Sequence, residues 1–165
     1  MHDVRIEVGL AVRDLEPTDL ADLDWSGGPH HIRALAAAYE RSFADQVELV
    51  LITLGNGLPI AVGAVDFAKR DAAGELWMLS VRDEWQSLGV GTILITELED
   101  RIRRRGLSRA TLGVEHDNPR AAALYQRLGY VQDGLVLDGW PEGPGRSYAT
   151  VCFTYSKPLS LTGAI

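Results

Sequence analysis

The sequence predicts one α/β (α+β) domain over residues 1–165, in which helices flank a mixed β-sheet. The chain has 165 residues, of which 46% are hydrophobic and 24% charged, so it can bury a core and has the composition of a globular protein. Segments with alternating apolar residues are interleaved with segments of helical period, in the order βααββ and then βαβαββ. No linker-like stretch divides the chain, and we therefore expect a single domain.

The first half of the chain predicts a strand, two helices and a β-hairpin. Apolar and charged residues alternate over 4–13, which is typical of a half-buried strand. A short helix is expected over 16–23, where a proline and acidic residues stand in the first turn, and a second helix over 32–43. Residues 47–67 are apolar on both sides of a Gly-Asn-Gly turn at 55–57, so they are expected to form two strands of a hairpin.

The second half of the chain alternates strands and helices. The predicted elements are a strand over 75–81, a helix over 92–105, a strand over 108–117, a helix over 119–128, a strand over 130–137, a Gly/Pro loop over 138–147 and a strand over 148–159. Leu94, Leu98 and Ile102 recur at helical spacing, and Gly106 stands where a C-terminal cap belongs.

The charge balance restricts the class of partner. Sixteen Lys and Arg against 23 Asp and Glu give a net charge of −7, which argues against a nucleic-acid partner. It is compatible with a cationic partner such as an amine, and equally with plain solubility. The arginine run 103–105 closes a predicted helix, where the helix dipole favours cations, and Glu99 and Arg103 have the spacing of a favourable ion pair.

Cysteine and histidine usage indicates neither a disulfide nor a metal site. Cys152 is the single cysteine of the sequence, and its place in an apolar strand predicts a core residue rather than a nucleophile. The four histidines show no metal-ligand spacing. No N-terminal signal and no long apolar run is present in the sequence, so we expect a cytoplasmic protein that does not associate with a membrane.

The stretch QSLGVGT, residues 86–92, is the first candidate binding motif. Gly89 and Gly91 stand between a predicted strand and a predicted helix, where backbone N–H groups can bind a phosphate and glycine allows it to come close. The alternative is a tight turn without a ligand. The dinucleotide pattern G-x-G-x-x-G fails because its third glycine position is Leu94, and the P-loop pattern lacks its Gly-Lys pair.

Two separated motifs resemble those of one family. Gln86 to Gly91 match Q/R-x-x-G-x-G/A, which is similar to the acyl-CoA-binding motif of the GNAT N-acetyltransferase superfamily. The segment DNPRAAALYQRLGY resembles the family's N-x-x-A-x-x-L-Y-x-x-x-G-F/Y motif. Its matching residues are Asn118, Ala121, Leu124, Tyr125, Gly129 and Tyr130. The resemblance is close over residues 58–131 and follows the order of elements elsewhere.

The resemblance implies a fold, a reaction and a co-substrate. The fold would be a GNAT-type domain with a mostly antiparallel sheet that splays between strands 4 and 5. The reaction would be direct transfer of acetyl from acetyl-CoA to a primary amine of a small molecule or a protein, in a ternary complex and without a metal. A non-catalytic acyl-CoA-binding sensor is the alternative. The oligomeric state is expected to be a monomer or a homodimer.

The resemblance also implies which residues bind acetyl-CoA. The pantetheine arm would lie beside strand 4 like an added strand, and the pyrophosphate would lie on the glycine loop. The implied binding residues are Leu79, Ser80, Val81, Gln86, Ser87, Leu88, Gly89, Val90, Gly91, Thr92, Asn118, Arg120 and Tyr125. Asn118 can equally be a helix N-cap. The backbone N–H of Val81 would stabilise the oxyanion.

Two residues are the candidate catalytic groups. Tyr125 matches the family tyrosine that protonates the leaving thiolate, although an apolar helical stripe around it also fits a core residue. Glu75 opens strand 4 and is the candidate general base, with a solvated strand end as the alternative. Counting by twos along an ideal strand puts its side chain on one face with Trp77, Leu79 and Val81. Further candidates are Glu115 and His116, which end strand 5.

The acceptor site is expected between two loops rich in glycine and aromatic residues. In this family the acceptor lies between the early helical loop and the connection of the last two strands. The candidate contacts are Trp25, His30, His31, Trp77 and Trp140. Aromatic walls beside carboxylates would suit a cationic amine, whereas the alternative is two ordinary surface loops.

Overall fold

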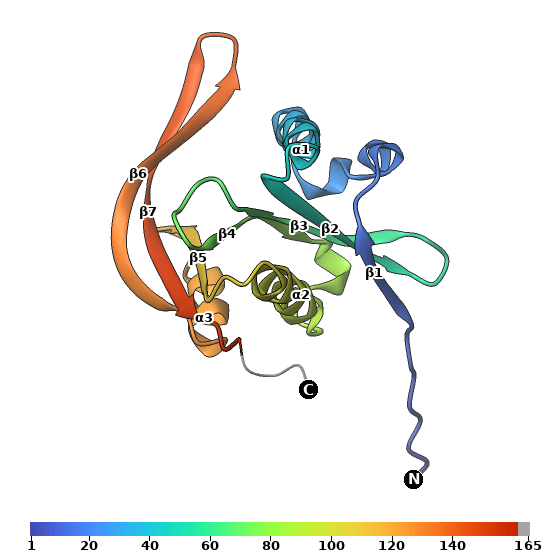
Figure 1. Cartoon of the computed structure of the whole chain (residues 1–165). Coiled ribbons are helices and arrows are strands. Elements are labelled where there is room, and N and C mark those ends of the chain that lie inside the picture. Colours follow the sequence, from blue (N-terminus) through green and yellow to red (C-terminus); the bar gives the residue numbers. More distant parts are fainter. Residues whose placement is uncertain (162–165) are drawn as a thin grey trace.

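Seven strands form one continuous sheet in the order β1-β2-β3-β4-β5-β7-β6 (Figure 1). This computed structural model describes residues 1–161. The strands are β1 (Leu10–Asp14), β2 (Val47–Leu54), β3 (Pro59–Asp66), β4 (Gly74–Val81), β5 (Arg109–Glu115), β6 (Val131–Gly143) and β7 (Arg146–Pro158). The helices are α1 (Pro29–Ser42), α2 (Val90–Arg104) and α3 (Pro119–Arg127), with 3-10 turns at Pro17–Asp22, Asp24–Ser26 and Asp83–Trp85. Strands β4 and β5 pair in parallel and the other neighbouring pairs are antiparallel, which confirms the predicted mixed, mostly antiparallel sheet.

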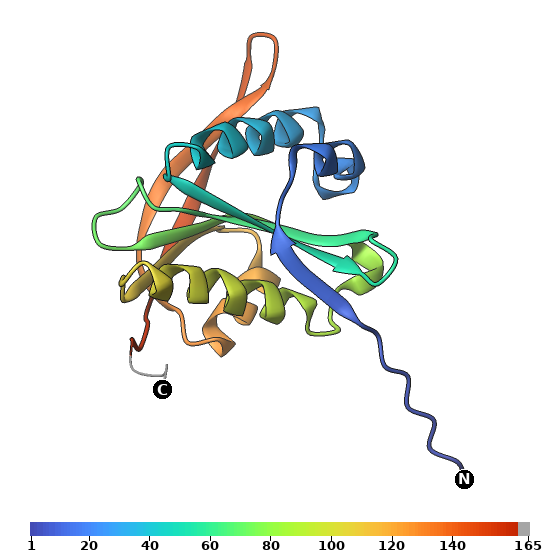
Figure 2. The same cartoon turned by 45° about the vertical axis from the view of Figure 1, so that its right-hand side comes forward.

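Helices cover both faces of the sheet. The face covered by α1 is called the α1 side below, and the face covered by α2 and α3 is called the α2 side (Figure 2). Leu49 and Leu51 of β2 pack with Leu35 of α1, whereas the alternate residues Val50 and Ile52 pack in the cluster that contains α2. The alternation of a strand buried on both faces thus divides the core into two layers.

The first strand is shorter than the alternation over 4–13 predicted. Strand β1 begins at Leu10, and Ile6 before it is 84% exposed. Leu10 pairs with Leu54, the last residue of β2, so the preceding residues have no strand beside them. Figure 2 shows this segment running away from the sheet. Residues 4–9 alternate as a strand would, but β2 ends opposite Leu10, so they have no neighbouring strand to pair with.

The predicted loop over 138–147 is wrong, because these residues extend a hairpin. Pairing of β6 with β7 continues as far as Gly143 and Arg146, with an irregularity after Pro141, so only a short turn separates the strands. Proline is tolerated here because β6 is an edge strand, with one side free of ladder bonds. Gly139 is required, since a Cβ there would lie 2.7 Å from the carbonyl oxygen of Tyr148.

Strands β4 and β5 pair over only part of their length, as the predicted splay requires. Residues 74–76 of β4 pair with residues 110–112 of β5, and the register ends there. From residue 77 to residue 81, the β5-facing edge of β4 has no ladder partner in the described chain. A gap therefore opens between the two central strands.

A β-bulge in β4 corrects the prediction that four alternate residues share one face. Between the pairs Ala64–Trp77 and Val62–Ser80, two residues of β4 oppose the single residue Gly63. Met78, the first of the two, has a φ of 52°. The extra residue reverses the alternation. Trp77 consequently packs with the α1-side cluster, whereas the next odd-numbered residues, Leu79 and Val81, pack with the α2-side cluster.

Candidate active site

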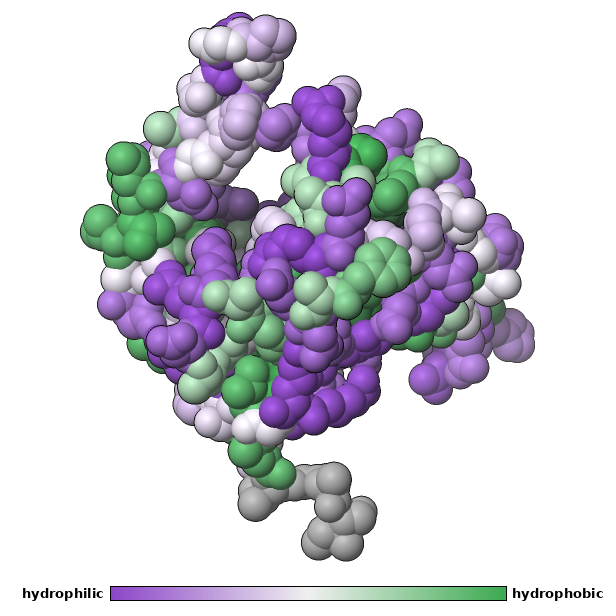
Figure 3. All heavy atoms as spheres, turned by 45° about the horizontal axis from the view of Figure 1, so that its top comes forward, coloured by the Kyte–Doolittle hydropathy of each residue, from purple (hydrophilic) through white to green (hydrophobic). Residues whose placement is uncertain are grey.

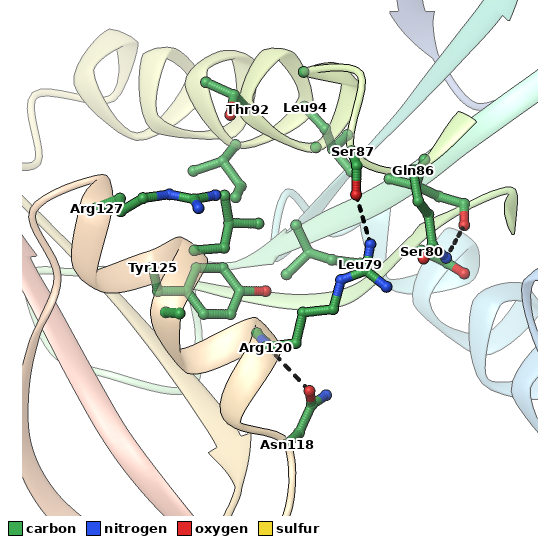
Figure 4. A pocket seen from close by; sticks show the side chains of 17 residues that line it. Leu79, Ser80, Gln86, Ser87, Thr92, Leu94, Asn118, Arg120, Tyr125 and Arg127 are labelled. Atoms are coloured by element: carbon green, nitrogen blue, oxygen red, sulfur yellow. Dashed lines mark hydrogen bonds between the residues drawn. The ribbon is translucent and has the colours of Figure 1, made fainter. Parts of the chain in front are cut away.

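A cavity of about 700 Å³ lies between the end of β4, the start of α2 and helix α3 (Figure 4). It opens on the α2 side of the gap between β4 and β5. The residues around it are Leu79, Ser80, Val81, Gln86, Ser87, Gly89, Gly91, Thr92, Leu94, Ile95, Asn118, Arg120, Ala121, Ala123, Leu124, Tyr125 and Arg127. The two sequence motifs thus meet at one cavity.

The loop from β4 to α2 presents backbone N–H groups to this cavity. Gly89 is the N-cap residue of α2, in the left-handed region with a φ of 89°, and no side chain caps the helix. The N–H groups of the first helical turn are therefore free for an anion, and the helix dipole adds positive potential. The Nε2 of Gln86 donates to the carbonyl oxygen of Val81 at 3.0 Å and braces this path.

Arginine side chains add charge to the same end of the cavity. The Nη2 of Arg120 donates to the Oγ of Ser87 at 2.7 Å, which links α3 to the loop before α2 (Figure 4). Arg127 also lines the cavity. Arg82 is engaged elsewhere, because its Nε donates to the carbonyl oxygen of Pro59 and its guanidinium lies over the ring of Trp25.

Helix α3 positions two of the predicted residues. The Oδ1 of Asn118 accepts a hydrogen bond from the N–H of Ala121 at 3.2 Å, so Asn118 is the N-cap of α3. Two turns later Tyr125 directs its ring into the cavity (Figure 4). Its hydroxyl has no hydrogen-bond partner among residues 1–161, and burial raises the pKa of Tyr125 to about 12. The phenol is therefore protonated at neutral pH.

Tyr130 packs against the ring of Tyr125 and is hydrogen-bonded to the buried carboxylate of Glu99. The two ring centroids lie 5.9 Å apart in an edge-to-face arrangement. The hydroxyl of Tyr130 donates to Glu99 at 3.0 Å, and the Nζ of Lys157 donates to the same carboxylate at 2.9 Å. We call Glu99, Tyr130 and Lys157 the buried network. It connects α2, the end of α3 and β7.

Most of the predicted cofactor-binding residues line the cavity. Leu88 and Val90 do not, because Leu88 is exposed on the loop and Val90 is buried in the core. The cavity is also lined by residues that were not among the predicted binding residues: Leu94, Ile95, Ala121, Ala123 and Leu124. Helical spacing from Gly91 to Leu94 and from Ala121 to Tyr125 contained the signal for most of them.

Glu75 lies outside the cavity and is paired with cations. Its carboxylate forms ion pairs with Lys69 at 2.6 Å and with Arg70 at 3.5 Å. It pairs with Thr111 in the part of the sheet where β4 and β5 are still joined. This carboxylate is therefore buried and engaged rather than solvated at a strand end.

The predicted acceptor residues lie on the α1 side. Trp25 and Trp77 belong to the α1-side cluster, and His30 and His31 are in the first turn of α1. Burial lowers the pKa of His31, which therefore is neutral at pH 7. Trp140 stacks on Tyr148 far along the hairpin, with ring centroids 4.8 Å apart. Figure 3 shows the molecule hollowed between this hairpin and α1.

Alternate residues of β5 face the α1 side of the sheet. Ala110, Leu112 and Val114 pack in the α2-side core, so the alternate residues of β5 face α1. These are Thr111, Gly113 and Glu115. The Oε1 of Glu115 is buried without a partner in the described residues. Glu115 and the cavity thus lie on opposite sides of the same gap.

Neither a metal cluster nor a membrane span is found in the part of the chain that the structure describes. No group of three or more His, Cys, Asp or Glu side chains there could hold a metal ion. No helix over 1–161 is long and apolar enough to cross a bilayer. Cys152 is buried and free, as its strand context predicted.

Comparisons with known proteins agree on the class of protein. The profile of the acetyltransferase (GNAT) family matches residues 17–130. The [ribosomal protein bS18]-alanine N-acetyltransferase of Escherichia coli strain K12 is 30% identical over 155 residues, which cover 91% of this chain and 98% of that protein. These relatives give no support to the non-catalytic alternative.

Solved structures show the same fold. The ribosomal-protein-S18-alanine N-acetyltransferase from Escherichia coli superimposes with a TM-score of 0.72 at 23% identity, covering 94% of this chain and 97% of the other. A spermidine/spermine N-acetyltransferase from Vibrio cholerae gives a TM-score of 0.68 at 18% identity, with coverage of 90% and 92%. Together with the family profile and the 30% identical relative, the fold shows that this chain belongs to the acetyltransferase (GNAT) family and is an acetyl-CoA-dependent N-acyltransferase.

Proposed function

We propose that this enzyme acetylates the N-terminal α-amine of a polypeptide. The observation that carries the proposal is the 30% identity, over nearly its full length, to an enzyme named for the alanine of ribosomal protein bS18. The spermidine acetyltransferases resemble this chain only in fold, at 18% identity. The hollow between the hairpin and α1 is open toward solvent (Figure 3), which suits a chain end better than a small molecule that must be enclosed.

Acid–base chemistry also favours an α-amine. An α-amino group has a reference pKa of about 8, against about 10.4 for lysine, so a larger fraction is already unprotonated at neutral pH. The chain's net charge of −7 and the Glu115 carboxylate on the α1 side favour binding of a basic polypeptide. The proposed setting is the cytoplasm, as expected from the sequence.

Acetyl-CoA supplies the activated acetyl group, and the cavity on the α2 side is its proposed site. The unpaired edge of β4 over residues 77–81 can pair with the amides of the pantetheine arm. The uncapped N-terminus of α2 and Arg120 can bind the phosphates. Tyr125 would donate its proton to the departing thiolate.

A Gly91→Val substitution tests the phosphate position. A Cβ at Gly91 would lie 3.8 Å from Leu124 and 3.9 Å from Val81, which is ordinary contact, so the variant is expected to fold. The added methyl groups would fill the space where the phosphate must approach the backbone. We expect the Kd for acetyl-CoA, measured by calorimetry, to rise by about tenfold or more.

The control for this experiment is Thr96→Val on the exposed side of the same helix, which should bind acetyl-CoA normally. An unchanged Kd in Gly91→Val would place the pyrophosphate elsewhere.

Glu115 is the better placed general base. Glu115 is the last residue of β5, three residues beyond Leu112, where the ladder between β4 and β5 ends, so it lies on the separated part of β5. The Oε1 of Glu115 is buried without a partner in the described chain. Glu75, by contrast, is held by Lys69 and Arg70 further down the sheet. A carboxylate with a free buried oxygen beside the gap can bind an ammonium group and accept its proton.

Glu115→Gln is therefore expected to lower kcat/KM about 100-fold at pH 7, and Glu75→Gln much less. The loss should become smaller as the pH rises above about 8, because the acceptor amine then loses its proton to solvent. Initial rates of CoA release across a pH series measure both effects. A larger loss in Glu75→Gln would identify Glu75 as the base, as the sequence predicted.

The acceptor class is tested with matched peptides. A basic peptide with a free N-terminus, the same peptide with a blocked N-terminus and one lysine, and spermidine are each incubated with enzyme and acetyl-CoA. We expect CoA release and a single acetyl group, located by mass spectrometry on the α-nitrogen of the first peptide only. Acetylation of the lysine or of spermidine at a comparable rate would overturn the proposal.

A further inference from the structure

Strand β6 forms one edge of the sheet, and no strand of the described chain pairs with its outer side. It has 13 residues and is last in the strand order, with β7 as its single neighbour. The opposite edge strand, β1, has five residues and includes the charged pair Arg13 and Asp14. The middle of β6 is instead the uncharged run from Leu135 to Leu137, and no Lys or Arg stands in the strand. Short length and charge keep edge strands from pairing, so β6 lacks the protection that β1 has.

Apolar side chains are exposed along this edge. Leu135 is 64% exposed and Leu137 78%, and Val136 between them is also exposed. The two leucines pair with Phe153 and Val151 of β7, and Phe153 packs against the α2-side core, so these four side chains share the α2 side. Figure 3 shows hydrophobic atoms gathered over the hairpin at the left of the view. A contiguous exposed patch of this kind marks an interaction surface, whereas scattered apolar residues do not.

The part of β6 that can accept another strand runs from Gly134 to Pro141. Its ladder with β7 is regular over this stretch and has an irregularity at each end. Asp133, the extra residue at the first irregularity, accepts a hydrogen bond from the hydroxyl of Thr154 at 2.8 Å and pairs with Arg109 at 3.5 Å. Its charge is therefore compensated within its own chain and does not oppose an approaching strand.

The sequence of this edge matches a second copy of itself. When a two-fold axis relates two antiparallel edge strands, facing residues have their side chains on the same side of the sheet, so the axis passes through one residue position. With the axis at Val136, Leu135 faces Leu137 of the second copy, and Gly134 faces its Asp138. With the axis at Leu137, Val136 would face Asp138, and with the axis at Asp138 two carboxylates would face each other. Apolar matching and charge thus select the register around Val136.

We propose that the protein associates with a second copy of itself through antiparallel pairing of the two β6 strands around Val136. Strand addition at this edge joins the two sheets into one and supplies partners for the outward N–H and C=O groups of β6. It also brings the two apolar patches side by side, because each Leu135 then contacts Leu137 of the other copy. No residue of β6 lines the cavity beside α3, so the inference does not depend on the proposed acceptor.

Leu137→Lys tests the apolar contact between the copies. The side chain is exposed in one chain, so the variant is expected to fold, and thermal unfolding checks this. Sedimentation equilibrium should give the wild-type protein twice the mass of one chain at high concentration. The lysine would face Leu135 of the second copy, and we expect it to raise the dimer Kd about tenfold or more. A wild-type protein that is still a monomer at about 1 mM, or an unchanged Kd in the variant, would overturn the inference.

Ile6→Lys is the matched control for this substitution. Ile6 is also exposed, and it lies in the N-terminal segment, where apolar residues alternate without a neighbouring strand. The variant introduces the same charge at a distant apolar position and should leave the dimer Kd unchanged. If Ile6→Lys dissociated the dimer and Leu137→Lys did not, the N-terminal segment would form the contact and the inference would be wrong.

Disulfide cross-linking tests the register. Cys152 lies opposite Val136 within one chain, so it is first removed by Cys152→Ala. In that background Val136→Cys would face its own copy at a Cα–Cα distance of about 4.5–5.5 Å, within reach of a disulfide. Val151→Cys, at a similarly exposed position on β7, would lie at least three strand spacings, about 14 Å, from its copy. Oxidation should therefore give a covalent dimer of the first variant only. Cross-linking of neither variant, or of both equally, would overturn the inference.

Discussion

Replacing Tyr125 by phenylalanine should lower kcat about 100-fold or more, with the Kd for acetyl-CoA nearly unchanged. The hydroxyl points into the cavity and has no partner among the described residues, so its removal leaves no group unpaired. General acid catalysis by a positioned side chain contributes about 10²- to 10⁴-fold. The phenyl ring would retain its edge-to-face contact with Tyr130, whose centroid lies 5.9 Å away. Single-turnover rates and calorimetry separate the two effects.

The pH profile and a second tyrosine variant are the controls for this prediction. Because burial raises the pKa of Tyr125 to about 12, the phenol keeps its proton throughout the neutral range and loses it only as the pH approaches that value. We therefore expect no loss of kcat from this group below about pH 11. Tyr39→Phe, on α1, should leave kcat unchanged. A Tyr125→Phe enzyme with full kcat would exclude Tyr125 as the acid.

Glu99→Ala should lower the free energy of unfolding by about 3 kcal/mol. Glu99 is 4% exposed and accepts hydrogen bonds from Tyr130 and from Lys157. Its removal leaves a hydroxyl and an ammonium group without their partner. The value is at the low end of the range for buried pairs, because the Lys157 side chain is 23% exposed and can regain some water. For a chain of this size the melting temperature should fall by roughly 6–12 °C.

The neighbouring residue on the same helix provides the control. Asp100 pairs with Arg103 at 2.8 Å, but its side chain is 45% exposed, so Asp100→Ala should cost less than about 1 kcal/mol. Denaturant unfolding of both variants gives the comparison. Similar losses would mean that the buried network is no stronger than a surface ion pair.

The same variant links stability to catalysis through Tyr130. The carboxylate of Glu99 fixes the hydroxyl of Tyr130, and the ring of Tyr130 packs on Tyr125. Helix α3 has no fully buried residue, so its position depends on such contacts at its end. The buried network therefore supports the predicted acid as well as the core.

The central elements were predictable because their signals are local. Helical spacing of apolar residues marked α2, and a turn of glycine and asparagine marked the β2–β3 hairpin. Asn118 and the proline after it marked the start of α3. The two motifs placed the cavity residues on the correct elements, since each motif is continuous in the sequence.

The errors arose where a strand depends on a distant partner. The alternation over 4–13 predicts a strand, but β2 ends opposite Leu10. The glycines and prolines of 138–147 predict a loop, but β7 continues beside β6 and supplies their hydrogen bonds. The alternation of an ideal strand predicts Glu75 and Leu79 on one face of β4. The bulge at Met78 adds a residue and puts them on opposite faces. A bulge depends on the register with β3, which the sequence of β4 alone does not contain.

By itself the sequence determined the order of elements, the family and the two motifs around the cavity, because these depend on short-range periodicity and on continuous segments. Only the tertiary structure decided which carboxylates are free. Glu99 forms the i,i+4 ion pair with Arg103 that its spacing predicted, at 3.7 Å, but it is also buried against Lys157. Glu75 is neutralised by Lys69, whereas Glu115 keeps a free oxygen at the gap. The physical reason is that burial and pairing depend on chain segments many residues apart.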